Sequence, residues 1–390
     1  MEQNPIFDNT ATAFKLKSDA QLERAYFLFK MISKEPLVRI GTAVTKFALN
    51  VSLPVEGLIR STVFDHFCGG VSESDCMPVV DNLQQAGVHS VLDYSVEGKE
   101  EEAQFDKTAA KVLELTEFAK EKEAMPFSVF KPTGIGRFEI WQKKSEGTPL
   151  NSVEEAEWER IVERYDQICA EAAAAGIALL IDAEESWMQL AADELCEAMM
   201  RKYNKEKAVV YNTLQCYRWD RLDYLKELHQ HAKSEGFKLG FKVVRGAYME
   251  KENERAADKG YPTPICPSKE ASDQNFNTVM QYIMDHINEI YLFLGTHNER
   301  SSYLAMEIMA AKGLRRNDER VWFGQLYGMS DHITYNLAAV GYNVAKYIPF
   351  GPVKDVMPYL IRRAEENTSV AGQTSRELDL IKRERERRQI

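Results

Sequence analysis

The sequence predicts an α/β fold in which eight parallel β-strands alternate with helices and close into a (β/α)8 barrel. Three observations support this prediction. Eight short apolar runs rich in β-forming residues follow one another from residue 88 onward. Stretches with helical spacing of polar and apolar residues separate them. Eight such units in about 280 residues match the usual size of this barrel. A doubly wound open sheet is the alternative architecture.

The apolar runs define the predicted strands, and the segments between them define the helices. Residues 154–175 and 268–288 are examples of intervening segments with helical periodicity. Alternation of this kind is typical of βαβ units, which build parallel sheets. The strands are expected at residues 88–94, 127–130, 178–181, 208–214, 239–244, 290–294, 321–323 and 344–348.

The two ends of the chain are expected to be helical and to lie outside the barrel. In the first 85 residues, Leu22, Ala25, Tyr26 and Phe29 recur at the spacing of one helix face. The last stretch, residues 382–388, alternates basic and acidic side chains, which predicts the end of an exposed helix. We therefore divide the chain into a helical arm (1–85), a catalytic barrel (86–370) and a basic helical tail (371–390).

Composition excludes several classes of function. The chain has 390 residues, and its 60 acidic and 49 basic residues give a net charge of −11, which disfavours nucleic-acid binding. Its six cysteines are scattered without a C-x-x-C pair, as expected for reduced thiols rather than disulfides or a metal site. The first residues lack the pattern of a signal peptide, and residues 43–59 contain Lys46 and Glu56, so no membrane span is expected there. A cytoplasmic location is the expectation.

Polar residues follow nearly every predicted strand. In a (β/α)8 barrel the active site lies at the C-terminal ends of the strands, so these residues are the candidates for function. Lys131, Lys242 and Arg245 would bring cations to this end, which favours an anionic ligand such as a carboxylate or a phosphate. The strand-end residues are Lys131, Asp182, Gln215, Arg245, Gly246, Ala247, Thr296, His297, Asn298 and Tyr347.

A second candidate is a stripe on the helix expected after the last strand. Tyr359, Arg362, Arg363 and Glu366 fall at i, i+3, i+4 and i+7, on one helix face. Adjacent arginines can bind a carboxylate through paired, charge-assisted hydrogen bonds. The alternative is a solvated polar face. A helix beginning near Asp355 would place Pro358 in its first turn, where a missing N–H is tolerated.

The motifs that are missing point to chemistry carried by an organic cofactor. The segment Gly134-Ile-Gly136 lacks a third glycine at the dinucleotide-binding spacing, and neither a P-loop nor a G-x-S-x-G motif occurs. Without a nucleophile or a metal-ligand set, a bound cofactor is the remaining source of reactivity. His297 is a candidate acid, base or stacking partner, although a lone histidine is more often structural.

At these residues the chain resembles the proline dehydrogenase family. The resemblance rests on four segments: Phe241-Lys-Val-Val-Arg-Gly-Ala-Tyr248, Gly295-Thr-His-Asn298, Phe323-Gly-Gln-Leu-Tyr-Gly-Met329, and residues 347–367. It covers roughly residues 90–367, and the last segment is the most specific. The order Lys242 before Arg245 is closer to the stand-alone and mitochondrial-type members.

The resemblance implies a distorted (β/α)8 barrel that binds FAD, with the last helix as a lid. It implies oxidation of L-proline to 1-pyrroline-5-carboxylate, the first step of proline degradation to glutamate, with electrons passed to a quinone. Reduction of a quinone would require at least transient contact with a membrane, at the inner face of the cell membrane, and the basic end near Arg383–Arg388 is the candidate for that contact. The implied roles are as follows: catalytic Asp182 and Lys242; substrate-binding Lys131, Tyr347, Tyr359, Arg362, Arg363 and Glu366; cofactor-binding Ala183, Gln215, Arg245, Gly246, Ala247, Thr296, His297 and Asn298.

Three alternatives stay open. One is a hydroxyproline dehydrogenase, although the bulk of Tyr347 mildly favours unsubstituted proline. Another is a cofactor-free barrel lyase or aldolase that uses Lys131 or Lys242 as a Schiff base. The third is a non-catalytic scaffold that binds amino acids.

Overall fold

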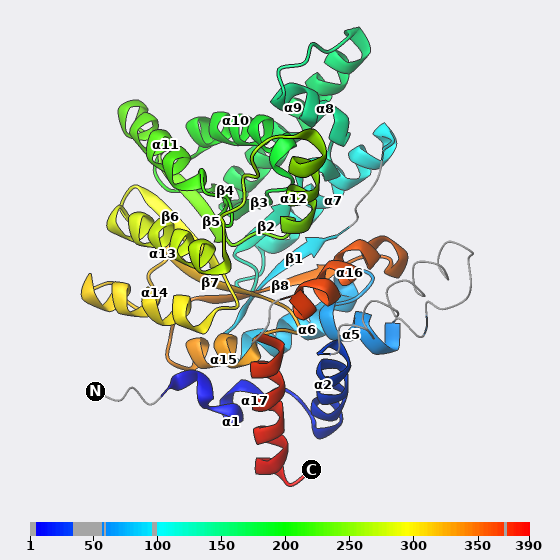
Figure 1. Cartoon of the computed structure of the whole chain (residues 1–390), viewed down its shortest axis with the longest axis vertical. Coiled ribbons are helices and arrows are strands. Elements are labelled where there is room, and N and C mark those ends of the chain that lie inside the picture. Colours follow the sequence, from blue (N-terminus) through cyan, green and yellow to red (C-terminus); the bar gives the residue numbers. More distant parts are fainter. Residues whose placement is uncertain (1–4, 34–56, 58–59, 96–99, 370–372) are drawn as a thin grey trace. The chain divides into compact units, whose positions relative to one another are not determined.

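A computed structural model describes residues 5–33, 57, 60–95, 100–369 and 373–390. Eight parallel strands form a nearly closed barrel flanked by helices, which confirms the predicted fold class (Figure 1). The sheet order is β1-β8-β7-β6-β5-β4-β3-β2. The strands are β1 (His89–Tyr94), β2 (Phe127–Phe130), β3 (Ala178–Ile181), β4 (Val210–Gln215), β5 (Leu239–Val244), β6 (Ile290–Gly295), β7 (Val321–Leu326) and β8 (Val344–Phe350).

The predicted strands agree closely with the observed ones. β2, β3 and β5 have the predicted bounds, β4 differs by two residues at its start and one at its end, and the others differ by at most three residues at one end. The largest difference is β7, which continues through Gly324 and Gln325 to Leu326, so these residues belong to the strand and not to the loop after it. Every residue of β4 and of β8 is buried. This continuous burial is typical of parallel strands covered on both faces.

The chain forms two compact units. The terminal unit comprises residues 1–96, 297–302 and 324–390, and the central unit comprises residues 97–296 and 303–323. β7 and helix α14 (Glu299–Ala311) each run from one unit into the other. The boundaries of arm, barrel and tail that we infer from the sequence stay a prediction.

The helices of the central unit alternate with its strands. Their ends follow local rules: Asn151 and Glu154 form a capping box at the start of α9, and Gly176 ends the same helix in a left-handed conformation. Helices α7, α9, α10 and α13 pack on strands of this unit. The helices are α7 (Glu102–Lys120), η3 (Pro132–Gly134), α8 (Phe138–Ser145), α9 (Ser152–Ala175), α10 (Ser186–Tyr203), α11 (Arg221–Glu235), α12 (Met249–Lys259) and α13 (Lys269–Asp285).

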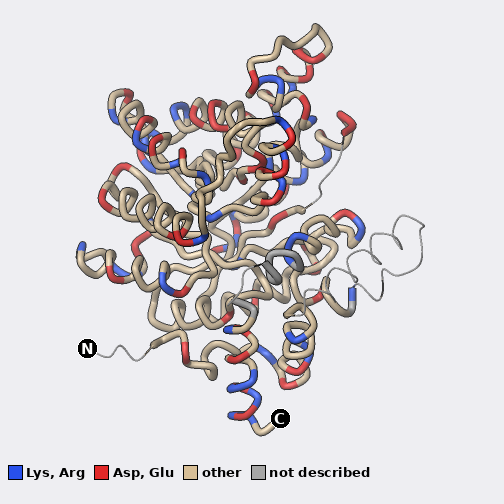
Figure 2. The backbone as a smooth tube through the Cα atoms, viewed as in Figure 1, with Lys and Arg blue, Asp and Glu red and all other residues tan. Residues whose placement is uncertain are grey.

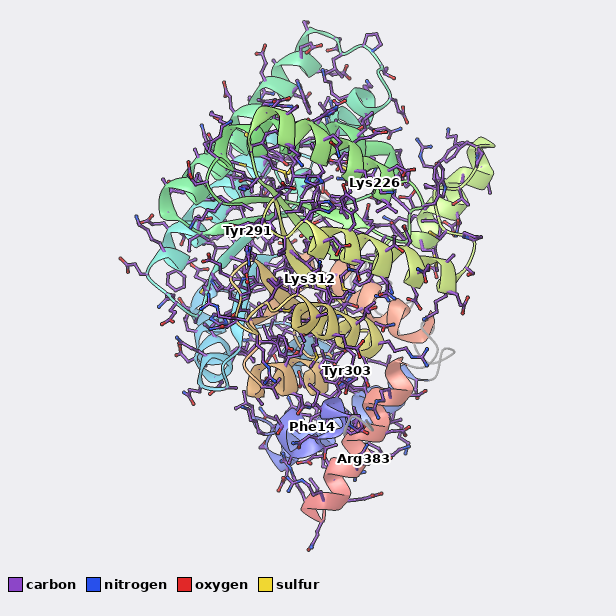
Figure 3. The ribbon with its side chains drawn as sticks, turned by 90° about the vertical axis from the view of Figure 1, so that its left-hand side faces the viewer. Phe14, Lys226, Tyr291, Tyr303, Lys312 and Arg383 are labelled. Carbon is purple, nitrogen blue, oxygen red and sulfur yellow. The ribbon has the colours of Figure 1, made fainter. Side chains whose placement is uncertain are left out.

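The terminal unit joins both ends of the chain. Its last helix packs against α1 and α2, and Figure 3 labels Phe14 and Arg383 on either side of this contact. Leu380 and Ile381 lie in one apolar cluster with Phe14, Leu22 and Phe29. The helices are η1 (Ile6–Asp8), α1 (Thr10–Ala13), α2 (Asp19–Ile32), η2 (Arg60–Phe64), α5 (Asp65–Phe67), α6 (Glu73–Gln85), α15 (Asp331–Ala339), α16 (Val353–Ser369) and α17 (Gln373–Arg388).

Packing of α17 corrects one prediction and confirms another. The tail is not a fully exposed helix, because one face is buried and its arginines other than Arg387 form ion pairs with the N-terminal helices. Arg385 pairs with Glu23 at 2.5 Å and Arg388 pairs with Asp19 at 3.0 Å. Figure 2 shows the alternating charges along this helix. The predicted face of α2 is confirmed, since Leu22, Ala25 and Phe29 are buried and Tyr26 is partly buried against them.

Helix α16 begins earlier than its sequence suggests. It starts at Val353 rather than near Asp355, so Pro358 lies in its second turn and not in its first. At that position a proline removes one backbone hydrogen bond, which the buried apolar face of the helix must outweigh. Val356, Met357 and Leu360 form that face in an apolar cluster with Phe64 and Phe67.

Two further findings concern the cysteines and the membrane. All six cysteines are buried and free, as expected for reduced thiols. Burial raises the pKa of the Cys216 thiol well above its usual value, so this side chain is not an activated nucleophile.

Within the described part of the chain, every helix is too short or too polar to cross a membrane.

Candidate active site

Three charged side chains meet at the C-terminal ends of strands in the central unit. Lys131 follows β2, Asp182 follows β3, and Lys242 lies within β5. The Asp182 carboxylate forms ion pairs with the ammonium of Lys131 at 3.3 Å and with that of Lys242. The side chains of Lys131 and Asp182 keep 14% and 16% of their surface exposed. We call these three residues the Asp182 triad. The structure thus brings these three predicted residues together.

The loop after β3 is held in place by Glu184. Its carboxylate accepts hydrogen bonds from the backbone N–H and the hydroxyl of Thr133, at 3.0 and 2.6 Å. Its backbone N–H donates to the side chain of Gln189 in α10. These contacts tie the loop that carries Asp182 and the half-buried Ala183 to the loop after β2. The triad is thus preorganised by groups that are themselves fixed.

Gln215, the last residue of β4, presents a buried acceptor. Its amide nitrogen donates to the carbonyl oxygen of Glu184 at 2.9 Å. Its side-chain oxygen has no hydrogen-bond donor among the described residues, although the residue is only 2% exposed. An unsatisfied buried acceptor is costly. The side-chain oxygen of Gln215 is suited to accept a hydrogen bond from a ligand that supplies an N–H group, as a flavin ring does.

Arg245 is fixed in the loop after β5. Its Nε donates to Asp273 at 2.6 Å, its Nη1 donates to the hydroxyl of Thr296 at 3.0 Å, and its guanidinium lies 4.3 Å from the ring centre of Phe276. Burial raises the pKa of Asp273, but hydrogen bonds from Lys269 and Arg245 outweigh it, and the pKa falls below its usual value. Asp273 therefore stays charged and holds Arg245 as a placed cation.

Gly246 is required by a neighbouring ring. Its φ of +135° is one that other residues rarely adopt, and a Cβ there would lie 2.3 Å from the ring of Tyr217. The glycine thus makes room for Tyr217, which the sequence alone did not suggest. The next residue, Ala247, is half-buried.

His297 and Asn298 belong to the terminal unit. The Nδ1 atom of His297 lies 2.9 Å from the hydroxyl oxygen of Ser330. The side-chain oxygen of Asn298 accepts the backbone N–H of Ser301 at 3.0 Å, in the first turn of α14. Asn298 thus has a structural role as a helix cap, whereas the ring of His297 is oriented by a hydroxyl group.

The predicted carboxylate-binding stripe lies in the terminal unit and is largely buried. Tyr359 and Arg363 are 6% and 9% exposed, and the Arg363 guanidinium lies 5.3 Å from the Tyr359 ring centre. Arg362 is half-buried. A solvated face is therefore excluded for Tyr359 and Arg363. Tyr347 in β8 is also buried, and the side chain of Glu366 lies outside the described residues.

Comparison with known proteins identifies the family. The family model for proline dehydrogenase matches residues 76–376. The chain belongs to the proline dehydrogenase family. Members of this family named proline dehydrogenase are oxidoreductases, and this protein is an enzyme of that class.

The relatives of this proline dehydrogenase family member include proteins with different names. It is 37% identical to the carbapenem antibiotics biosynthesis protein CarD from Pectobacterium carotovorum subsp. carotovorum, over 86% of this chain and 87% of the relative. It is 31% identical to mitochondrial proline dehydrogenase 1 from Arabidopsis thaliana, over 100% of this chain and 86% of the relative.

A solved structure supports the fold. Proline utilization A from Bdellovibrio bacteriovorus, inactivated by N-propargylglycine, matches with a TM-score of 0.72 and 20% identity. The match covers 95% of this chain and 40% of that much longer one. At this identity the likeness establishes the barrel architecture alone.

Sequence reasoning missed several residues that position the predicted site residues or their neighbours. Asp273 holds Arg245, Thr133 is held by Glu184, and Ser330 orients His297. A weak signal existed for Asp273, because it lies four residues after Lys269 on one helix face. The partners of Thr133 and Ser330 are 51 and 33 residues away in the chain, so local patterns carry no information about them.

Proposed function

We propose that this protein oxidises L-proline to 1-pyrroline-5-carboxylate with FAD as the bound cofactor. The observation that carries the proposal is the Asp182 triad, set at strand ends in a chain of the proline dehydrogenase family. The reaction is the first step of proline degradation to glutamate. Electrons would then pass to a quinone or another acceptor.

FAD fits the residues that the structure presents. The buried, unsatisfied acceptor of Gln215 suits an N–H of the flavin ring, and Arg245 is a fixed cation suited to the cofactor's phosphates. We assign the other cofactor contacts to Ala183, Gly246, Ala247, Thr296, His297 and Asn298. When bound, FAD supplies a two-electron acceptor whose N5 position can take a hydride from C5 of proline.

The charges of the protein have distinct roles in this proposal. Arg362 and Arg363 bind the proline carboxylate, and a two-point clamp fixes the orientation of the substrate ring. Glu366 orients the arginines, while Lys131, Tyr347 and Tyr359 shape the pocket. A buried guanidinium such as that of Arg363 is stabilised when an anion reaches it.

Asp182 and Lys242 are assigned to catalysis. Asp182 holds two ammonium groups in place, and Lys242 is 6% exposed, so its charge acts in a medium of low polarity. A fixed cation stabilises negative charge that develops as the cofactor is reduced. The proline amine must be neutral when the hydride leaves. The low local polarity together with two nearby cations favours that neutral form.

The Schiff-base alternative is disfavoured by the same triad. A Schiff-base lysine must present a free amine lone pair to a carbonyl group. Lys131 and Lys242 are both ion-paired to Asp182, and a Schiff-base role would require either lysine to give up that contact. Hydroxyproline remains a second substrate candidate, and the buried position of Tyr347 favours unsubstituted proline.

The test is spectroscopic. The purified protein is expected to show flavin absorbance, and addition of L-proline without oxygen is expected to bleach it. Trans-4-hydroxy-L-proline is expected to bleach it more slowly. A colourless protein that cannot be reconstituted with FAD would exclude the proposal. Borohydride trapping of a carbonyl substrate on Lys131 or Lys242 would favour a lyase instead.

A quinone acceptor implies at least transient contact with a membrane, and we place the protein in the cytoplasm, peripheral to the inner face of the cell membrane. All five arginines of α17 form ion pairs within the described structure, so this helix offers less free charge to lipids than its sequence suggests. Flotation with quinone-containing anionic liposomes, with and without proline, tests the contact.

A further inference from the structure

The loop between β7 and α15 is fixed by buried polar groups from other segments of the terminal unit. Lys346 in β8 donates to the carbonyl oxygens of Leu326 and Met329. The Nε2 atom of His66 lies 2.9 Å from the carbonyl oxygen of Gly328. Lys346 is fully buried. Burying an amine or an imidazole is unfavourable unless the group is hydrogen-bonded. The hydrogen bonds of Lys346 and His66, and not apolar packing alone, therefore hold the loop in place.

Ser330, at the end of this loop, has a strained backbone. Its φ of 52° and ψ of 40° lie in the left-handed region, which is unfavourable for a residue with a side chain. It is completely buried. Such a conformation persists only where the surroundings enforce it. The backbone N–H of Ser330 donates a hydrogen bond to the carboxylate of Glu377, at 2.9 Å.

Glu377 is a buried carboxylate at the start of α17. It is 4% exposed, and burial raises its pKa above the usual value. The groups around it are the ring of His332 at 3.8 Å and the charges of Asp331 and Lys346. Next to it, Arg376 forms ion pairs with Glu299 at 2.7 Å and with Asp8 at 2.6 Å. The first turn of α17 is therefore anchored by charge as well as by apolar contact.

The hydroxyl of Ser330 completes a path from α17 to the candidate site. It lies 2.9 Å from Nδ1 of His297. We propose that α17 is a positioning element for the cofactor-binding wall: Glu377 fixes Ser330, and Ser330 fixes the ring of His297. The proposal rests on the function proposed above, in which His297 contacts FAD.

Simple packing of the helix does not account for these contacts. Apolar packing explains why Leu380 and Ile381 are buried against α2. It does not explain a carboxylate placed in the interior and aimed at the N–H of a strained residue that also bonds to His297. Supporting contacts of this kind set the orientation of a binding side chain, and a displacement of about 1 Å can cost about 10²-fold in rate.

The chain offers a matched control for Glu377. Glu384 is also a buried carboxylate in α17, and it bonds to Arg387 and Arg388 in the same helix and to Thr10 in α1 rather than to the loop before α15. Replacing either glutamate by leucine removes one buried charge from the same helix. Loss of stability is expected from both, whereas loss of His297 positioning is expected from Glu377 alone.

The experiment titrates FAD into flavin-free protein and follows quenching of flavin fluorescence. Glu377→Leu is expected to raise the Kd for FAD at least tenfold, and Glu377→Gln by less, because an amide oxygen can still accept the Ser330 N–H. Glu384→Leu is expected to lower Tm but to leave this Kd within twofold of the parent. The proposal is overturned if Glu377→Leu leaves the Kd within twofold, or if Glu384→Leu raises it equally.

A second pair of variants covers failure of Glu377→Leu to fold. Ser330→Ala and Ser330→Gly both remove the hydroxyl, and only glycine also relaxes the backbone. Both are expected to raise the Kd for FAD at least threefold, which would show that the hydroxyl matters apart from the strain. An unchanged Kd in both variants overturns the proposal.

Nuclear magnetic resonance separates this proposal from the proposed function. The chain has seven histidines, so selective ¹⁵N-histidine labelling resolves their rings, and His297→Gln identifies the signal of His297. If the parent protein binds no FAD, the proposed function fails, and this readout decides the positioning role alone. The His297 signal is expected to shift in flavin-free Glu377→Leu and not in Glu384→Leu. An unchanged signal in Glu377→Leu overturns the proposal.

Discussion

Each of the two units contains an aspartate between two lysines, and the two triads differ in how they are closed. In the central unit Asp182 pairs with Lys131 and Lys242. In the terminal unit Asp331 pairs with Lys17 at 3.0 Å and with Lys346 at 2.9 Å. We call the latter set the Asp331 triad. The two sets have the same residue types and the same net charge.

The Asp331 triad is more deeply buried at its aspartate and at one of its lysines, although the side chain of its other lysine, Lys17, is 23% exposed. The side chain of Asp331 is 6% exposed and that of Lys346 is fully buried, and Lys346 also donates to two backbone carbonyls. Burial raises the pKa of Asp331, but the two lysines outweigh it and hold the pKa far below its usual range. In the Asp182 triad, Lys131 and Asp182 keep 14% and 16% exposure at strand ends. A buried aspartate that is paired with a fully buried lysine supports the fold, whereas a more exposed aspartate can exchange partners with a ligand.

The largest expected effect breaks the Asp331 triad. Asp331→Asn is expected to lower the free energy of unfolding by about 3–5 kcal/mol, because it leaves buried Lys346 without its carboxylate. Equilibrium unfolding in urea measures it. Asp182→Asn is the matched control and is expected to cost less, since Asp182 and Lys131 keep 16% and 14% of their side-chain surface exposed, whereas Asp331 keeps 6% and Lys346 none. Equal losses from both variants would remove the distinction between the triads.

The next effect concerns the two arginines of the terminal unit that we assign to binding the proline carboxylate. Arg363→Met and Arg362→Met are each expected to lower kcat/KM for proline by about 30- to 1,000-fold, equivalent to about 2–4 kcal/mol. Steady-state kinetics of reconstituted enzyme measures it. Arg387→Met, which changes a 54% exposed arginine of α17, is the control and is expected to keep the parent value. An unchanged kcat/KM would remove that arginine from the clamp.

The Asp182 triad is expected to respond in activity rather than in stability. Asp182→Asn should lower kcat/KM by about 10²-fold, because Lys131 and Lys242 lose the carboxylate that places them. Rapid-reaction measurement of flavin reduction by proline separates the chemical step from binding. A parent-like rate of reduction would show that the triad is structural in both units.

A smaller effect is expected from pH, and it belongs to the terminal unit. Burial lowers the pKa of His66 from 6.5 to about 3, so the unfolded chain binds a proton that the folded protein excludes between these values. Stability is therefore retained above pH 6.5 and falls as the pH drops toward 3, by up to about 1.4 kcal/mol per pH unit. Urea unfolding at pH 7.5, 6.5, 5.5 and 4.5 measures the slope. His66→Gln, which does not titrate, is expected to flatten it, and an identical slope in both proteins would contradict the assignment.

The carboxyl group of Glu299 also makes stability decrease as the pH falls, in a lower pH range than His66. Burial raises the pKa of this carboxyl, but hydrogen bonds from His332 and Arg376 outweigh it and bring the pKa to about 2. Its contribution is complete above pH 4.5 and is lost as the pH falls toward 2. The His66→Gln variant should therefore still lose stability below pH 4.5.

The sequence predicted the barrel well because strands and helices are encoded locally. Continuous apolar runs gave the bounds of β2, β3 and β5, and capping residues such as Asn151 and Gly176 mark helix ends within a few positions of the chain. Family motifs then pointed to Lys131, Asp182 and the arginines of α16. The predicted start of α16 was wrong by two residues. Because a proline is tolerated best in the first turn of a helix, the start was expected near Asp355, whereas Pro358 lies in the second turn of the observed helix.

Tertiary structure decided which charges meet. Lys131, Asp182 and Lys242 come from three strands, and Lys17, Asp331 and Lys346 come from three segments of the terminal unit, so no spacing in the sequence relates them. The same holds for Glu377 and Ser330, which are 47 residues apart. Periodicity reports which face of an element is buried, because that depends on near neighbours. Ion pairing depends on how distant segments are brought together, and burial then determines whether an aspartate between two lysines is sealed into the fold or left open to a ligand.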